Sequence, residues 1–219
     1  LSADSVLQIA AHEEAFGQER LQGVCHTARA LLDKRRMRVG RVIARPFLGD
    51  SVGSFRRTSN RHDYSLTPGE TVMDRLGKQD VKVIGVGKIS DIFAGKGISE
   101  SHPTKDNAEG MEVIGEIWRG SAKTDCFVFA NLVDFDSLYG HRRDPEGYAR
   151  CLMEFDEWLG NFLGKLTGDD LLVITADHGN DPYHSGTDHT REQVPCLVVS
   201  GGGFESGEMH IFSDIGRCV

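Results

Sequence analysis

The chain has 219 residues, with 25 basic and 33 acidic side chains and a formal net charge of -8 at pH 7. This acidic balance argues against a nucleic-acid-binding surface, and no run of like charges contradicts it. The sequence contains neither a stretch of about 18 apolar residues nor a signal peptide, so it indicates neither a membrane protein nor an exported one. Its 5 cysteines include no CxxC pair, which is typical of free thiols in a reducing compartment, and we therefore expect a cytoplasmic protein.

The first part of the chain, residues 1–68, has an irregular pattern. Apolar spacing predicts a helix near Leu21 to Leu32, and the run 39–44 is typical of a strand. The polar segment from 49 to 64, rich in arginine and serine, indicates a loop. The chain begins at Leu1 without a methionine and directly enters an apolar segment, so we expect a piece of a longer protein.

From residue 69 onwards the pattern becomes a regular alternation of apolar strands and amphipathic helices. Pro145 in the first turn of one helix, and apolar positions at a period of about 3.6 along it, support that assignment. The alternation predicts an α/β fold with a mostly parallel sheet covered on both faces. The expected strands are 81–86, 126–133, 171–175 and 194–199, and the expected helices are 71–76, 107–119 and 145–166.

Aspartate and histidine side chains follow two of these strands, where open α/β sheets place their ligand sites. Carboxylate and imidazole donors suit a divalent ion such as Mn²⁺ or Zn²⁺, and the absence of paired cysteines argues against a structural zinc site. The candidates exceed what one ion usually takes from protein alone, so two adjacent ions are favoured, and such a pair suits phosphoryl transfer. The candidate ligands are Asp136, His141, Asp177, His178 and His189.

Each of these residues also has a purely structural interpretation. Asp177 could cap a helix and leave His178 on the surface. Asp136 could cap the helix that follows it, while His141 is simply exposed. The purely structural reading requires all of these interpretations to be true at once, for residues that all follow strands. We therefore favour the metal site.

Three segments carry a resemblance to a known family. Residues 131–144, 174–181 and 186–192 resemble the signatures of the phosphopentomutases, which belong to the alkaline phosphatase superfamily of dinuclear metalloenzymes. The resemblance implies an alkaline phosphatase-like three-layer core with a mostly parallel sheet at residues 69–219, and part of a small α+β cap domain for substrate recognition at residues 1–68. Similar stretches at 2–14, 40–47, 60–64 and 87–93 extend it over nearly the whole chain.

The resemblance also implies roles for single residues, and Mn²⁺ is the usual ion of the family. Asp177 and His178 match ligands of the ion that contacts the nucleophile, whereas Asp136, His141 and His189 match ligands of the second ion. The phosphate chemistry agrees, because arginine offers a planar fork to a phosphate and lysine a point charge. The positions that match the sugar-phosphate pocket are Ser2, Asp4, Val6, Arg41, Ile43 and Arg57 in the cap, and the phosphate-contacting Lys88 in the core.

An enzyme of this family interconverts ribose 1-phosphate and ribose 5-phosphate, and the 2-deoxyribose equivalents. The resemblance therefore implies pentose phosphates as small-molecule partners, two Mn²⁺ ions as cofactors and a bisphosphate sugar as intermediate and activator. The phosphoryl group would pass through a phosphothreonine, which splits the mutase reaction into two transfers.

The sequence departs from the family at both ends. Members carry an N-terminal segment with a further aspartate ligand and the phosphorylated threonine, and nothing here resembles it; the C-terminal end of the pattern is also missing. Thr175, Thr187 and Thr190 lie inside other motifs, so none of them matches the phosphorylated threonine. We therefore expect no mutase turnover from these 219 residues alone. Two alternatives stay open: a relative on the same scaffold, either a cofactor-independent phosphoglycerate mutase or a phosphatase, and an inactive metal-binding fragment.

Overall fold

The computed structural model describes residues 5–120, 124–201, 209–217 and 219. Contacts divide the chain into a first unit, Leu1–Asp74 with Ile89–Ile98, and a second unit, Arg75–Lys88 with Ser99–Val219. The boundary at residue 68 that the sequence suggests stays a prediction. Ser2 and Asp4, expected in the sugar-phosphate pocket, lie outside the described residues. Within the described part of the chain, no helix is long and apolar enough to cross a membrane.

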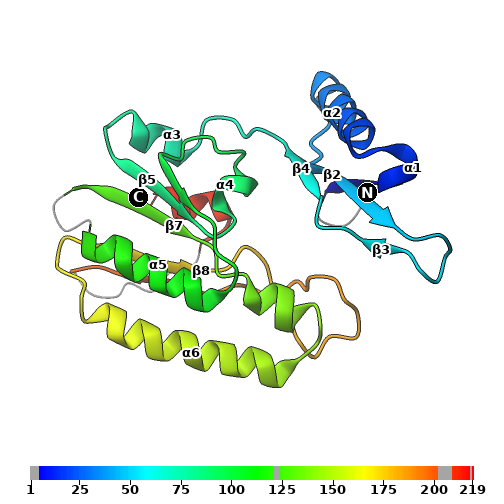
Figure 1. The fold of residues 1–219 in the computed structure, drawn as a ribbon. Helices are drawn as coiled ribbons and strands as arrows, with labels where there is room; N and C mark the ends of the chain where they lie inside the picture. The colour runs from blue at the N-terminus through cyan, green and yellow to red at the C-terminus, as the bar shows by residue number, and fades with distance from the viewer. Residues whose placement is uncertain (1–4, 121–123, 202–208, 218) are drawn as a thin grey trace. The chain divides into compact units, whose positions relative to one another are not determined.

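The first unit is built on a small mixed sheet (Figure 1). The strand β2 (Arg41–Leu48) pairs in parallel with β1 (Val6–His12) along one edge. Along the other edge β2 pairs antiparallel with the short strands β3 (Arg56–Arg57) and β4 (His62–Ser65). The expectation of a loop throughout 49–64 is therefore wrong, because the chain reverses after Gly49 and returns along β2.

The helix α2 (Gln18–Lys34) covers one face of this sheet, preceded by the short α1 (Glu13–Phe16). The buried side chains of Leu21 and Cys25 on α2 form a hydrophobic cluster with Val42 and Ala44 on β2. Side chains alternate between the two faces of a strand, so the neighbours of Val42 and Ala44 on β2 belong to the opposite face of the sheet. These neighbours are Arg41, Ile43 and Arg45.

The second unit contains a parallel sheet in which β5 (Lys82–Val86) lies between β6 (Glu100–His102) and β7 (Cys126–Ala130). Four consecutive residues of β5, from Val83 to Val86, are buried, as expected for a central parallel strand covered on both faces. A separate antiparallel pair joins β8 (Leu172–Thr175) to β9 (Cys196–Val199). The α/β class with parallel strands is confirmed.

Two long helices, α5 (Asn107–Gly120) and α6 (Pro145–Leu163), run alongside each other below the sheet in Figure 1. They meet through Trp118 and Phe162, whose ring centroids are 5.6 Å apart. Asp144 caps α6 by accepting a hydrogen bond from the Gly147 amide at 2.9 Å, and Pro145 occupies the first turn. The remaining elements are α3 (Val72–Gly77), α4 (Ile89–Ile92), the π-helix η1 (Phe135–Gly140) and the 3-10 helix η2 (Phe212–Arg217).

Candidate metal centre

The carboxyl ends of β5 and β7 meet at one edge of the parallel sheet, and candidate functional residues follow both. Lys88 comes just after β5 and is exposed. The segment after β7 is anchored by a reciprocal pair: the Asn107 amide donates to Asp134 Oδ2 at 2.8 Å, and the Asp134 amide donates to Asn107 Oδ1 at 2.9 Å. This buried pair fixes the start of η1, which carries Asp136.

The π-helix explains how Asp136 and His141 come together. A π-helix bonds residue i to residue i+5, and the His141 amide donates to the Asp136 carbonyl at 2.9 Å. Their side chains consequently lie on one side, with His141 Nε2 3.4 Å from Asp136 Oδ2. The five-residue spacing of the two ligands is thus a property of this helix type.

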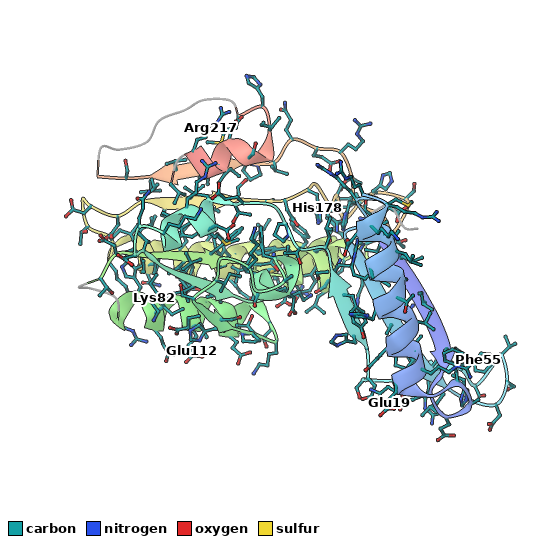
Figure 2. All side chains as sticks on the ribbon, turned by 90° about the horizontal axis from the view of Figure 1, so that it is seen from above. Glu19, Phe55, Lys82, Glu112, His178 and Arg217 are labelled. Atoms are coloured by element: carbon teal, nitrogen blue, oxygen red, sulfur yellow. The ribbon has the colours of Figure 1, made fainter. Side chains whose placement is uncertain are left out.

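Two further imidazoles converge on the same carboxylate from the loop after β8, where Figure 2 labels His178. His189 Nε2 lies 3.3 Å from Asp136 Oδ1, and the His189 ring stacks on that of His178 with centroids 3.5 Å apart. One ligand atom from each of Asp136, His178 and His189 falls within 4.8 Å of the others, close enough to share an ion. The stacked ring of His141 lies 4.9 Å from that of His189.

The backbone fixes which ring nitrogen carries the proton in two of these histidines. His141 Nδ1 lies 2.6 Å from the Thr187 carbonyl, and His178 Nδ1 lies 3.2 Å from the Gly179 carbonyl. A carbonyl only accepts, so Nδ1 must donate, and in the neutral ring the lone pair is then on Nε2. Histidine ligands of metals typically have their other nitrogen held in this way, so the donor set fits a divalent ion.

Asp177 is the most exposed of the predicted ligands, with 77% of its side-chain surface accessible, and its Oδ1 lies 3.6 Å from His178 Nε2. No helix follows Asp177 in the described loop up to β9, so the helix-cap interpretation of this residue is wrong. Asp136 lies inside η1, whose cap is Asp134, so the capping interpretation is wrong there as well. His184, in the same loop, is exposed and lies outside the cluster of ligand atoms.

The other predicted binding residues that the structure describes lie on the sheet of the first unit. Val6 pairs with Arg41 across β1 and β2, and Ile43 lies two residues further along the same face. Arg57 pairs with Phe47 at the far end of β2. The side chains of Val6 and Ile43 are buried, whereas Arg57 is exposed.

Arginines gather around this face of the sheet. Arg61 donates to the two oxygens of the Asp63 carboxylate through Nε and Nη2, and Arg41 Nη1 lies 3.6 Å from the same carboxylate. Burial lowers the pKa of Arg45, and the charges of Arg61 and Arg57 lower it further, against the opposing effect of Asp63. The surplus of positive charge suits an anionic ligand such as a phosphate.

Three residues that sequence reasoning did not select organise the ligands of the second unit. Asn180 donates a hydrogen bond to Asp136, Arg143 contacts Asn180, and Gly140 leaves room for that amide. All three lie inside the segments that resemble the phosphopentomutase signatures, which is the one signal that points to them. Their residue types alone predict no ligand role.

Comparison with known proteins defines the class to which this fold and site belong. Residues 8–219 match the Metalloenzyme superfamily, and the chain belongs to that superfamily. Among curated proteins it is similar to phosphopentomutases: it is 54% identical over 222 residues to the one from Clostridium beijerinckii, 50% over 223 residues to the one from Limosilactobacillus reuteri and 53% over 221 residues to the one from Symbiobacterium thermophilum.

Each of these alignments covers 100% of this chain and 56% of the relative. The chain therefore spans about half the length of the curated relatives that it matches. A solved structure, that of the PH0037 protein from Pyrococcus horikoshii, superposes with a TM-score of 0.48 at 16% identity over 90% of this chain and 57% of that one, which is too distant to inform the site.

Proposed function

We propose that the full-length protein is a phosphopentomutase, interconverting the 1-phosphate and 5-phosphate of ribose and 2-deoxyribose. The observation that carries the proposal is the convergence of Asp136, His178 and His189, with their ligand atoms within 4.8 Å, at positions inside the segments that resemble the family signatures. The identity of 50% or more to three phosphopentomutases along the whole chain supports the same activity. A cytoplasmic location belongs to this proposal and rests on the sequence.

The proposed cofactor is a pair of Mn²⁺ ions. Asp136, His141 and His189 would hold one ion, and Asp177 and His178 would contribute to the other. The bound pair would neutralise charge that develops on the transferring phosphoryl group. The protein's own part is preorganisation: the Thr187 and Gly179 carbonyls, both in the loop after β8, hold the rings of His141 and His178 so that Nε2 is available to bind.

The proposed substrate contacts follow from the sequence resemblance. Arg41 and Arg57 would bind the sugar phosphate on the first unit, where Val6 and Ile43 offer buried apolar surface. Lys88 would contact a phosphate from the second unit. Ser2 and Asp4 complete the proposed pocket on sequence grounds alone. A bisphosphate sugar is proposed as activator because it is the intermediate of the same reaction.

The test is turnover by the full-length protein with Mn²⁺ and a bisphosphate sugar. Phosphorus NMR would follow the conversion of ribose 1-phosphate to ribose 5-phosphate, with 3-phosphoglycerate and p-nitrophenyl phosphate as rival substrates. We expect conversion of the pentose phosphate with little release of inorganic phosphate. Faster turnover of 3-phosphoglycerate, or release of phosphate as the main product, would replace the proposal with one of the two rival activities. Metal binding without turnover of any substrate would support an inactive metal-binding protein.

A further inference from the structure

A chain of hydrogen bonds runs from Arg143 through Asn180 to Asp136. Asn180 Nδ2 donates to Asp136 Oδ1 at 2.6 Å, and Asn180 Oδ1 accepts from Arg143 Nη1 at 2.7 Å. A guanidinium has donors only, so it must face the amide oxygen and turn the amide NH₂ towards the carboxylate. The orientation of the Asn180 amide is therefore set by the chemistry of both of its neighbours.

Arg143 is itself held firmly by the backbone around it. It donates to the carbonyls of Gly140 at 3.0 Å, Asp181 at 2.8 Å and Asp188 at 2.6 Å, and also to that of Gly186. These carbonyls belong to the end of η1 and to the loop that carries His189. One half-buried side chain thus ties together the two segments that supply the ligands.

Two backbone features show that this arrangement is built into the chain. Arg143 has a φ of 54°, a left-handed conformation that residues with a side chain rarely adopt. Gly140 is buried, and a Cβ added to it would lie 2.3 Å from Asn180 Nδ2 and 2.9 Å from the Phe135 carbonyl oxygen. Only glycine therefore leaves room for the amide in its present place.

We propose that Asn180 and Arg143 are positioning residues of the metal centre, an inference that rests on the metal site proposed above. Asn180 holds the Asp136 carboxylate so that one oxygen faces His189 Nε2 at 3.3 Å and the other faces His141 Nε2 at 3.4 Å. Arg143 acts through Asn180 by fixing its amide. Residues that hydrogen-bond to metal ligands typically raise the affinity of the site for its metal in this way.

The experiment measures Mn²⁺ affinity of the full-length protein by electron paramagnetic resonance of free Mn²⁺. Asn180→Ala is expected to weaken binding by roughly 10- to 100-fold, the usual cost of removing an outer partner of a ligand. Arg143→Ala should also weaken it, and the double variant should lose no more affinity than Asn180→Ala, because the arginine acts through the Asn180 amide. Arg142→Ala, an exposed arginine next in sequence, is the matched control and should bind as the wild type does.

Thermal unfolding of the metal-free proteins separates positioning from folding. If Asn180→Ala is unfolded without metal, Asn180→Leu, which keeps the volume and removes the donor, decides the question. A folded variant with wild-type Mn²⁺ affinity overturns the positioning role while leaving the metal site intact. Independent, additive losses in the double variant overturn the relay from Arg143. A wild-type protein that binds no Mn²⁺ overturns the proposed site itself.

Discussion

Replacement of His189 by alanine tests the metal centre most directly. His189 Nε2 lies 3.3 Å from Asp136 Oδ1, and its ring is stacked between those of His178 and His141, with centroids 3.5 Å and 4.9 Å away. The rings of His141 and His178 are each hydrogen-bonded to a backbone carbonyl, so neither can replace the His189 ring without breaking that bond. If the site holds two ions, we therefore expect the variant to lose about one Mn²⁺ ion per protein.

The size of the effect follows from the number of ligands. Asp136, His141 and His189 are the ligands proposed for this ion, with both imidazole Nε2 atoms 3.3 to 3.4 Å from the Asp136 carboxylate, and the variant keeps only two of the three. Removal of an outer partner already costs roughly 10- to 100-fold in affinity, so loss of a direct ligand should exceed 100-fold, or about 2.7 kcal/mol. At low free Mn²⁺ the site would then stand empty.

The assay is elemental analysis of the full-length protein after removal of free Mn²⁺ by gel filtration. His184→Ala is the matched control, because His184 is exposed in the same loop and lies outside the ligand cluster. It should retain the wild-type metal content. Unchanged metal content in His189→Ala would refute the assignment and return this residue to a packing role.

Three further predictions concern recognition, packing and thiol chemistry. Arg41→Ala and Lys88→Ala should each raise KM for ribose 1-phosphate roughly ten-fold or more, because a charge-assisted hydrogen bond contributes about 1.5–3 kcal/mol, while the metal content stays unchanged. An unchanged KM in both variants would show that these are solvated surface charges without a role in binding. Gly140→Ala should weaken Mn²⁺ binding as Asn180→Ala does, because its Cβ would displace the Asn180 amide, whereas Gly160→Ala on α6, where a Cβ meets nothing within 4 Å, should not. Burial raises the pKa of the Cys25 and Cys151 thiols, so less thiolate is present at pH 8. Iodoacetamide should therefore label the partly exposed Cys126 and Cys196 before these two, and mass spectrometry showing Cys151 labelled before Cys126 and Cys196 would contradict this.

The long elements could be predicted because each carries a strong local pattern. The buried run of β5 and the capped, amphipathic α6 are readable from apolar spacing and from Pro145. The strands β3 and β4 could not, because their polar sequence matches a loop and they form only by pairing with β2. Their stability comes from tertiary context, which a local pattern does not contain.

The same division holds for the site. The carboxylate and imidazole ligands are recognisable because their chemistry and their place after strands suit a metal. Asn180 and Arg143 are not, since an amide and a guanidinium act here through hydrogen bonds that depend on the folded loops. The π-helix could not be predicted either, because the i to i+5 hydrogen bond that defines it is seen only in the folded chain.

That π-helix makes the site sensitive to chain length as well as to residue type. An α-helix advances about 100° per residue, so deleting Ser137, Leu138 or Tyr139 and closing the turn as an α-helix would change which backbone groups bond and rotate His141 relative to Asp136. Every ligand would still be encoded, yet the two would no longer face the same point. An insertion or deletion in these six residues should therefore be as damaging as the loss of a ligand, and related chains that keep the metal should also keep the number of residues between these two positions.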